Sequence, residues 1–333
     1  MKKKVKWLLS FVAVFILIVP LISCNKQEET YTLRVGEVTH SIFYAPQYVA
    51  LSEGFFEEEG LDVKLQTTWG GDKTMTALLS NGIDIALVGA ETSIYVYAQG
   101  ANDPVVNFAQ LTQTDGTFLV SREKVSEFSW EQLKGTTFLG QRKGGMPQMV
   151  GEYVLKQHNI DPQNDLDLIQ NVDFANIANA FASGTGDYVQ LFEPTASIFE
   201  KEGRGTIVAS FGEESGNVPY TTFMSKKSFI NENTEAIEKF TRAIYKAQQW
   251  VDTHSSKEIA ESIQPQFEDT PLDIIETVVE RYKAQQSYAT TPLLPEESWN
   301  NLQNIMNEAG ELPTKVDYSE LVNTSFAEKV ISE

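Results

Sequence analysis

Between residues 31 and 210 the chain alternates short segments that carry two kinds of hydrophobic pattern. Apolar residues that alternate with polar ones, or that run together for a few positions, indicate strands, whereas apolar residues three and four positions apart indicate helices. Strand, helix and strand in succession predict a parallel sheet with right-handed crossovers. The first unit contains predicted strands at 31–38, 61–67, 83–88, 105–111 and 118–120 and predicted helices at 45–52 and 72–81.

A second unit repeats this order. In the first unit a helix is followed by Asn81-Gly82-Ile83-Asp84 and a strand, and in the second a helix is followed by Ser183-Gly184-Thr185-Gly186-Asp187 and a strand. This echo predicts two similar α/β lobes. The second unit contains predicted strands at 136–140, 166–170, 188–192 and 206–210 and predicted helices at 146–157 and 177–183.

The chain becomes helical from residue 233 onward. Apolar residues between Ala236 and Val251 recur at steps of three and four positions, as on one face of a helix. Thr270-Pro271 begins a further helix with a capping residue and a proline in the first turn. These apolar stripes predict core packing and carry no chemistry. The whole pattern therefore predicts an α/β, two-lobed fold whose lobes are mostly parallel sheets flanked by helices, with a helical C-terminal part.

The N-terminal segment has the pattern of an export signal. Lysines among the first six residues precede an apolar stretch from Trp7 to Ile22, which contains a proline and is shorter than the about 20 residues of a membrane span. Leu21-Ile22-Ser23-Cys24 resembles the bacterial lipobox, in which the cysteine is lipidated and becomes the first residue. Several acyl chains on one cysteine anchor a protein stably. We expect a signal peptide at 1–23 and a tether at 24–30 that is lipidated on Cys24; the alternative is a plain membrane anchor with a free cysteine.

Composition excludes several kinds of partner and site. Lys plus Arg number 26 and Asp plus Glu number 46, and the net charge of −20 argues against nucleic acid, because phosphate binding needs clustered cations. A single cysteine excludes a disulfide within the chain. His40, His158 and His254 lack the spacing of a metal site. We therefore expect no metal, no cofactor and no nucleic acid.

Candidate binding residues follow the predicted strands. In open parallel sheets, ligands bind beyond the carboxyl ends of the strands, where loops lead into helices. The loops at these positions combine aromatic residues, hydroxyl groups and glycines. Trp69 offers a flat face, and Gly70-Gly71 allow a ligand to approach the backbone closely. Such loops, at 39–44, 69–72, 89–92 and 113–116, predict a ligand cleft.

Two stretches resemble the signatures of a known family. The run from Tyr44 to Leu65 (YAPQYVALSEGFFEEEGLDVKL) resembles the opening signature of bacterial solute-binding proteins for nitrate, sulfonates, taurine and thiamine pyrimidine precursors, and 78–86 (LLSNGIDIA) resembles their second signature. Glu193-Pro194 after an apolar strand is also similar to the family pattern. The resemblance covers most of the chain, is dense from 34 to 120 and is thinner beyond 225.

The resemblance implies a type II periplasmic-binding-protein fold that closes on a small molecule between its lobes and delivers it to an ABC importer. The expected partners are that small molecule, the permease and ATPase complex of the importer, and the membrane through a lipid anchor, with the chain itself a monomer. Its expected location is outside the cytoplasm, anchored to the outer face of the bacterial cell membrane. We expect lobe I at 31–120 plus 220–333 and lobe II at 121–219, with crossings near 118–123 and 217–222.

Residues of the second lobe complete the predicted site. Lys143-Gly144-Gly145 precede a helix, where they either bind an anion or form a turn. Glu193 either faces the cleft or caps a helix, and Tyr220 belongs either to the cleft wall or to the hinge. His40 is expected as a wall residue that forms hydrogen bonds rather than as a base. The predicted ligand-binding residues are His40, Ser41, Phe43, Tyr44, Trp69, Gly70, Gly71, Glu91, Thr92, Asp115, Lys143, Gly144, Gly145, Glu193 and Tyr220.

Acidic residues outnumber basic ones in these loops, which favours a ligand with N–H donors over an anion. The acids are Asp72, Glu91, Asp115 and Glu193, and the cations are Arg142 and Lys143. Because aromatic residues favour a flat molecule, we expect a pyrimidine-like nitrogen heterocycle that stacks on Trp69 and is held by Glu193. The alternative ligands are an alkanesulfonate, taurine or nitrate.

The less favoured alternative to a binding protein is an enzyme that synthesises a pyrimidine. A fungal branch of the fold makes a thiamine pyrimidine, and its members carry a cysteine-rich run that this chain lacks. No Ser-His-Asp or Cys-His pattern is visible in the sequence, although such groups meet in space rather than along the chain. We therefore expect no enzymatic activity and no catalytic residues.

Overall fold

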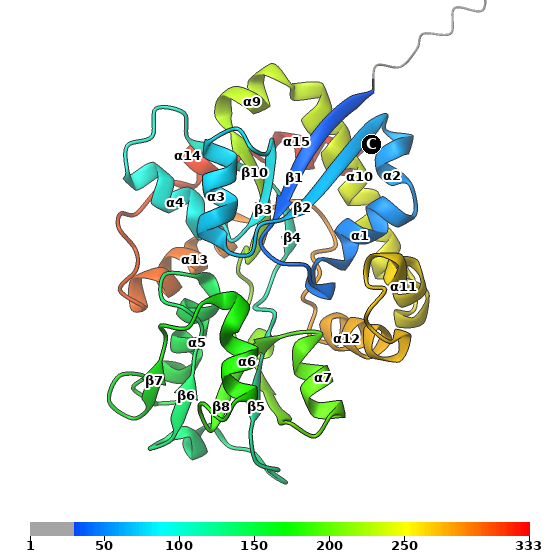
Figure 1. Cartoon of the computed structure of the whole chain (residues 1–333). Helices are drawn as coiled ribbons and strands as arrows, with labels where there is room; N and C mark the ends of the chain where they lie inside the picture. The colour runs from blue at the N-terminus through cyan, green and yellow to red at the C-terminus, as the bar shows by residue number, and fades with distance from the viewer. Residues whose placement is uncertain (1–29) are drawn as a thin grey trace, which may run out of the picture.

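The computed structural model describes residues 30–333 and contains two five-stranded sheets, one in each lobe (Figure 1). The predicted signal peptide, Cys24 and most of the tether lie outside the described residues. The first sheet has the order β2-β1-β3-β10-β4, and the second has the order β7-β6-β8-β5-β9. The strands are β1 (Tyr31–Glu37), β2 (Leu61–Thr67), β3 (Ile85–Val88), β4 (Val105–Thr112), β5 (Thr117–Ser121), β6 (Thr137–Leu139), β7 (Asp167–Ile169), β8 (Tyr188–Phe192), β9 (Thr206–Ser210) and β10 (Thr221–Lys226).

The two sheets share one pattern of strand directions. In the first, β1 is parallel to β2 and β3, whereas β10 is antiparallel to β3 and β4. In the second, β6 is parallel to β7 and β8, whereas β5 is antiparallel to β8 and β9. One strand in each sheet therefore runs against the others, and the prediction of two similar, mostly parallel lobes is confirmed.

The reversed strands are those that enter from the other lobe. β5 follows β4 of the first sheet, and β10 returns to that sheet after the last strand of the second. Because β5 pairs only with strands of the second sheet, the chain first crosses between the lobes between Thr112 and Thr117. This crossing comes earlier in the sequence than residue 120, where we predicted the first segment of lobe I to end. The return crossing ends at Thr221, and the following strand, β10, was absent from the predicted elements.

Hydrogen bonds tie the crossing segments to each other. The Asp115 N–H donates to Ser215 Oγ at 3.2 Å, and the Val218 N–H donates to the Gln113 carbonyl at 3.0 Å. The Gln113 N–H in turn donates to the carbonyl of Ser287, which follows the last residues of a C-terminal helix. Residues 113–115, 215–218 and 287 therefore form one narrow connection between the lobes.

Helices flank both sheets, and the chain ends in a series of them. The helices are α1 (Ala45–Ser52), α2 (Phe55–Glu58), α3 (Gly71–Leu79), α4 (Glu91–Ala98), α5 (Met146–Gln157), α6 (Ile177–Ala182), α7 (Thr195–Lys201), α8 (Phe211–Glu214), α9 (Lys227–Glu232), α10 (Thr234–Thr253), α11 (Ser256–Ile263), α12 (Leu272–Ala284), α13 (Glu296–Glu308), α14 (Tyr318–Leu321) and α15 (Ser325–Ser332). None of the helices in residues 30–333 is long and apolar enough to cross a membrane.

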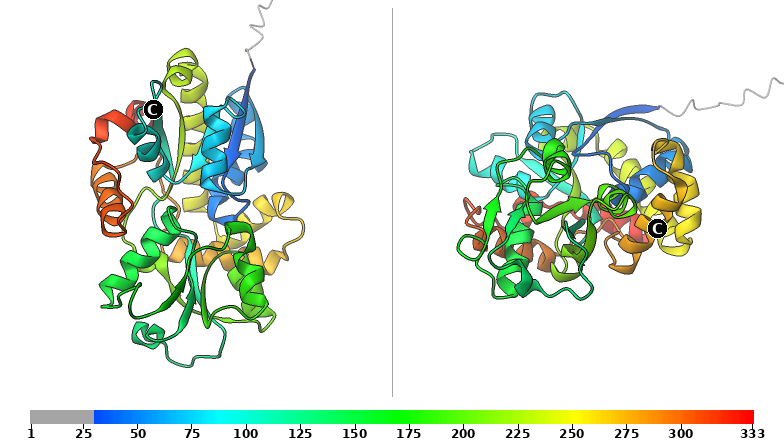
Figure 2. Two further views of the ribbon diagram at one scale, coloured as in Figure 1. Left: turned by 60° about the vertical axis from the view of Figure 1, so that its left-hand side comes forward. Right: turned by 60° about the horizontal axis from the view of Figure 1, so that its bottom comes forward.

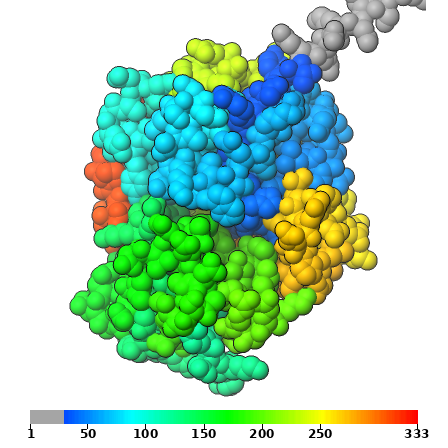
Figure 3. All heavy atoms as spheres, in the orientation of Figure 1, coloured from blue at the N-terminus to red at the C-terminus, as the bar shows by residue number. Residues whose placement is uncertain are grey.

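The C-terminal helices lie against both lobes. α12 packs on the 3-10 turn η1 (Ile42–Tyr44) of the first lobe and on α7 of the second, and α13 packs on α4 and α5. In a turned view, α13 and the pair α11–α12 lie on opposite flanks of the molecule (Figure 2). In the space-filling view, the first lobe (blue and cyan) rests on the second (green), with the yellow and orange helical segment beside both (Figure 3).

The predicted apolar stripes form the core. On α10 the residues from Ala236 through Phe240 to Val251 that fall on one face are no more than 2% exposed. Trp299 on α13 is fully buried, and its indole N–H donates to the Val316 carbonyl at 3.1 Å. These stripes hold the C-terminal helices on the lobes and line no part of the site described next.

Candidate functional site

A cavity of about 440 Å³ lies between the two lobes. Its lining includes residues that follow β1, β2 and β3 of the first lobe and β6 and β7 of the second, together with Phe192, the last residue of β8. The first turns of α3, α4 and α5 also contribute. The cavity therefore lies beyond the carboxyl ends of the parallel strands, as the strand-end rule predicts.

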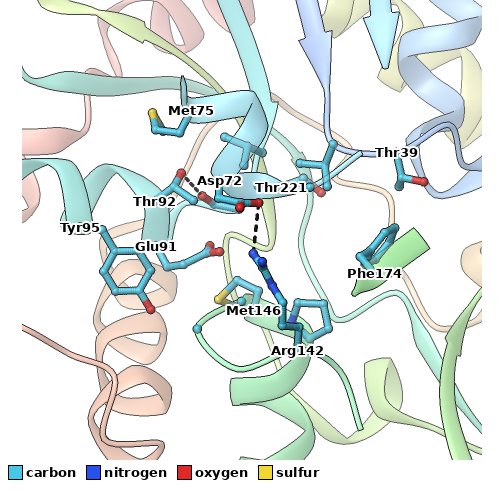
Figure 4. Close-up of a pocket in the computed structure, with 18 of the residues that line it drawn as sticks. Thr39, Asp72, Met75, Glu91, Thr92, Tyr95, Arg142, Met146, Phe174 and Thr221 are labelled. Atoms are coloured by element: carbon cyan, nitrogen blue, oxygen red, sulfur yellow. Dashed lines mark hydrogen bonds and ion pairs between the residues drawn. The ribbon is translucent and has the colours of Figure 1, made fainter. Parts of the chain in front are cut away.

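Most of the cavity wall is apolar or aromatic. Met75 comes from the first lobe, and Met146, Phe174 and Phe192 come from the second. Figure 4 shows Met75, Met146 and Phe174 around the cavity, with the polar side chains between them. A wall of this kind, interrupted by a few polar groups, is typical of sites for small organic molecules.

The loop before α3 presents its backbone to the cavity. Trp69 has φ 59° and Gly70 has φ 143°, so the chain turns sharply there. Gly70 and Gly71 line the cavity as a result, whereas the Trp69 side chain lies outside the lining and the residue is 49% exposed. The prediction that Trp69 stacks on a ligand inside the cleft does not fit this geometry, because the turn directs its ring to solvent.

Glu91, in the first turn of α4, is a buried acid in the cavity wall. It is 4% exposed, and its Oε2 has no hydrogen-bond partner within the described residues. The carboxyl lies over Gly89, where a Cβ would fall 2.1 Å from Oε2. Burial raises the pKa of Glu91 to about 8, although the backbone N–H groups of Glu91 and Met146 oppose that effect. Near pH 7 the side chain is therefore mainly a carboxylic acid, which both donates and accepts.

Tyr220 lines the cavity where the chain returns to the first lobe. It is 4% exposed, and its ring meets that of Phe43 edge-on with centroids 5.5 Å apart. Burial, reinforced by the charge of Asp115, raises the pKa of Tyr220 far above its usual value. Asp115 itself is fully buried in the crossing segment and accepts a hydrogen bond from the Thr117 N–H at 2.6 Å, and burial raises its pKa to about 6. Asp115 therefore belongs to the crossing and not to the cavity lining.

An ion pair joins the lobes across the cavity. Arg142 Nη2 lies 3.1 Å from Asp72 Oδ1, and Figure 4 draws this contact as a dashed line. The two side chains are 45% and 55% exposed, so the pair lies at the solvent edge and contributes little to stability. In the described part of the chain, Arg142 is the cation that lines the cavity.

Several predicted residues lie in the cavity wall. Their positions agree with a binding site, and their contacts with a ligand stay predictions. They are Tyr44, Gly70, Gly71, Glu91, Thr92, Gly144, Gly145 and Tyr220.

Glu193 does not line the cavity. It is 1% exposed, and Ser197 donates to its carboxylate twice, from the N–H and from the hydroxyl, each at 2.8 Å. Arg281 of α12 completes the shell, with Nη1 at 2.8 Å from Glu193 Oε1. The carboxylate therefore caps α7 and binds α12, away from the cavity lining.

The side chains of His40, Ser41 and Phe43, in the loop before η1 and in its first turn, also contact other parts of the protein. His40 Nδ1 lies 2.9 Å from Glu37 Oε1, and its Nε2 lies 2.7 Å from the Gln266 carbonyl. The Ser41 hydroxyl donates to the Glu193 carbonyl at 2.8 Å, which joins the lobes behind the cavity. Phe43 is fully buried against neighbouring rings. His40, Ser41 and Phe43 thus support the cavity wall from behind.

Lys143 points away from the cavity. Its side chain is 68% exposed, and Nζ lies 3.6 Å from Glu311 Oε1 in the C-terminal part. The turn that carries it, with Gly144 at φ 90°, brings the neighbouring glycines to the cavity instead. Within residues 30–333 no group of His, Cys, Asp and Glu side chains is arranged to hold a metal ion.

Some lining residues were missed in the sequence. Arg142 was noted only as a charge, although it lies three residues after the end of β6. Phe192 is the last residue of β8, and Phe174 follows β7, so the strand-end rule would have found both. Tyr95 and Met75 lie one turn inside α4 and α3, and no signal in the sequence distinguishes them from core residues.

Comparison with known proteins agrees with this architecture. The model of the NMT1-like family matches residues 26–264. A protein of Bacillus subtilis (strain 168) that bears the name "Putative binding protein YtlA" is 68% identical over 332 residues, which cover 98% of this chain and 99% of that protein.

Solved structures share the fold at low sequence identity. The periplasmic nitrate-binding protein NrtA from Synechocystis PCC 6803 gives a TM-score of 0.73 at 17% identity and covers 91% of this chain and 89% of its own. The alkanesulfonate-binding protein SsuA from Xanthomonas axonopodis pv. citri, bound to MOPS, gives a TM-score of 0.71 at 16% identity and covers 89% and 99%. The fold is therefore that of periplasmic binding proteins.

Proposed function

The chain belongs to the NMT1-like family, and from this premise we propose that it is a solute-binding protein that captures a small molecule between its lobes and delivers it to an ABC importer. The cavity is the observation that carries the proposal. It measures about 440 Å³, receives residues from both lobes and combines an apolar wall with few polar groups. Sites of this size and lining bind small organic molecules.

The favoured ligand is a pyrimidine-like nitrogen heterocycle. Tyr44, Phe174 and Phe192 supply aromatic surface in the cavity, in place of the exposed Trp69. Glu91 supplies a buried group that binds N–H donors and ring nitrogens, in place of Glu193. A flat molecule with a polar edge therefore fits the cavity better than a compact anion does.

A small anion such as an alkanesulfonate, taurine or nitrate is the second candidate. Arg142 at the cavity supports it, as do the ligands in the names of the structural neighbours NrtA and SsuA. Against it, Arg142 is already paired with Asp72, and Glu91 would have to stay protonated beside the anion. The acids that line the cavity therefore make this ligand class less favourable.

The proposal includes export and anchoring. The lipobox-like residues ending at Cys24 support a lipid anchor on the outer face of the cell membrane, from which the tether would hold a monomer near the permease and ATPase of the importer. With the first crossing moved to 113–116, we assign lobe I to 31–112 plus 220–333 and lobe II to 117–219. Ligand would draw the lobes together about the crossing segments, as in hinge closure of two-lobed binding proteins.

A binding and recovery experiment separates this function from the pyrimidine-synthesising enzyme. The mature protein is titrated calorimetrically with 4-aminopyrimidine and with ethanesulfonate, and each probe is then recovered and weighed by mass spectrometry. We expect saturable binding of 4-aminopyrimidine at one site and its unchanged recovery. Chemical conversion of the probe would contradict the proposal that the protein only binds its ligand. Binding of ethanesulfonate without binding of 4-aminopyrimidine would contradict the proposal that the ligand is a nitrogen heterocycle.

A further inference from the structure

Glu91 is an acid in the cavity wall that forms no ion pair with any residue in the described part of the chain. Burial leaves it 4% exposed, and Oε2 has no partner in the described structure. Arg142, the cation of the cavity, contacts Asp72 rather than Glu91 (Figure 4). A buried ionised carboxylate without a partner is strongly unfavourable, whereas a buried carboxylic acid needs only hydrogen bonds.

The position of Glu91 is fixed by its neighbours. Its carboxyl lies directly over Gly89, which has no side chain to displace it. Met146, on the opposite lobe, directs its backbone N–H toward the same carboxyl. The group is therefore held where both lobes meet and where a captured molecule would contact it.

We propose that Glu91 in its carboxylic acid form is the specificity-determining residue of this cavity, and that ligand capture occurs with one proton held on it. The inference rests on the function proposed above and identifies the group that recognises the heterocycle. The acid O–H donates to a ring nitrogen while the acid carbonyl accepts from an adjacent N–H. A 4-aminopyrimidine edge offers this acceptor and donor side by side, and no net charge is buried.

Other titratable groups lie around Glu91. Tyr44, Tyr95 and Tyr220 face the same region, and burial raises the pKa of each above its usual value. Asp72 and Arg142 contact each other at the edge of the cavity. The pKa of His40, beside the lining residue Thr39, is also raised above its ordinary value, so the part of the affinity change that Glu91→Gln abolishes is what reports on Glu91.

The test is calorimetric titration of 4-aminopyrimidine at pH 7.0 and pH 9.5. With a pKa of about 8, most Glu91 is protonated at the lower pH and about one molecule in thirty at the higher. The affinity of the natural protein should fall about thirtyfold. Glu91→Gln keeps one donor and one acceptor but does not ionise, so the affinity of this variant should be the same at pH 7.0 and pH 9.5.

Two controls isolate the effect. Glu152→Gln makes the same substitution at a buried acid of α5 that lies outside the cavity lining and accepts a hydrogen bond from Gln148 at 2.7 Å. In this variant the affinity for 4-aminopyrimidine should still fall about thirtyfold between pH 7.0 and pH 9.5. 4-Methylpyrimidine lacks the N–H donor and should bind at least tenfold more weakly than 4-aminopyrimidine at pH 7.0.

Each other outcome contradicts a defined part of the account. A pH-independent natural protein, or loss of binding in Glu91→Gln, overturns the acid form of Glu91 as the recognition group. Binding of ethanesulfonate without 4-aminopyrimidine overturns this inference and leaves solute binding intact. Failure of all three probes to bind to folded protein counts against both the inference and the proposed ligand class.

Discussion

Substitution of Arg281 by methionine should destabilise the protein without changing its affinity for a ligand. Arg281 binds Glu193, whose carboxylate is fully enclosed between α7 and α12, and its second nitrogen lies 3.0 Å from Glu200 Oε2. Methionine preserves the packing of the aliphatic stem and removes the charge. The Glu193 carboxylate would then keep only its hydrogen bonds from Ser197.

The magnitude follows from the burial of that carboxylate. Removing one partner of a fully buried pair costs about 3–5 kcal/mol, because the remaining charge is left without compensation. The Arg281 side chain is 30% exposed, so water partly screens the pair and the lower end of that range applies. We expect a loss of about 3 kcal/mol, and each kcal/mol lowers Tm by about 2–4 °C in a chain of comparable size.

Lys201→Met is the matched control. Lys201 and Asp273 form an ion pair at 2.8 Å between the same two helices, but their side chains are 51% and 70% exposed. An exposed pair contributes less than about 1 kcal/mol. Thermal unfolding followed by circular dichroism should show a drop of about 6–12 °C for Arg281→Met and a far smaller one for the control. Equal drops, or a loss of 4-aminopyrimidine binding in Glu193→Gln, would refute the structural role assigned to this pair.

Three further predictions concern other parts of the molecule. Gly89→Ala places a Cβ 2.1 Å from Glu91 Oε2, so we expect at least tenfold weaker binding of 4-aminopyrimidine by calorimetry, and unchanged affinity would contradict the position of Glu91. Burial alone would lower the pKa of His40, but the pKa is raised because the ring nitrogens face Glu37 and the Gln266 carbonyl. Protonated His40 therefore stabilises the folded protein. This stabilisation is complete below the pKa of His40 in the unfolded chain and is lost as the pH rises through its pKa in the folded protein. His40→Gln should therefore lower Tm more at pH 5.5 than at pH 9, and a pH-independent difference would exclude a charged His40. Cys24→Ala should release the protein from membranes, which cell fractionation measures, and continued membrane association with the signal removed would contradict the lipobox.

The sequence predicted the parallel framework closely because its local patterns are strong. α1, α5, β2, β8 and β9 begin and end where their hydrophobic patterns do. β10 was missed, since residues 221–226 (TTFMSK) are mainly polar, yet all but the last are buried by pairing with strands far away in the chain. A strand whose burial depends on pairing with strands distant in the sequence has no local signature.

The candidate site shows the same limit. The strand-end rule placed the loops correctly, and Glu91, Thr92 and Gly71 lie at the cavity. The strand-end rule does not predict the direction of a side chain. The Glu193 side chain points toward α7, the helix that follows it, because Ser197 and Arg281 compensate its charge there. Those partners lie 4 and 88 positions along the chain, and only the packing of α12 on α7 brings the second one close.

A crystal structure of the mature protein grown with 4-aminopyrimidine would show directly where this compound binds. We expect the ring inside the cavity between the lobes, with its amino edge on Glu91 and an aromatic side chain against its face. A ring bound elsewhere on the protein, or an empty cavity that ethanesulfonate fills beside Arg142 in a parallel crystal, would contradict it.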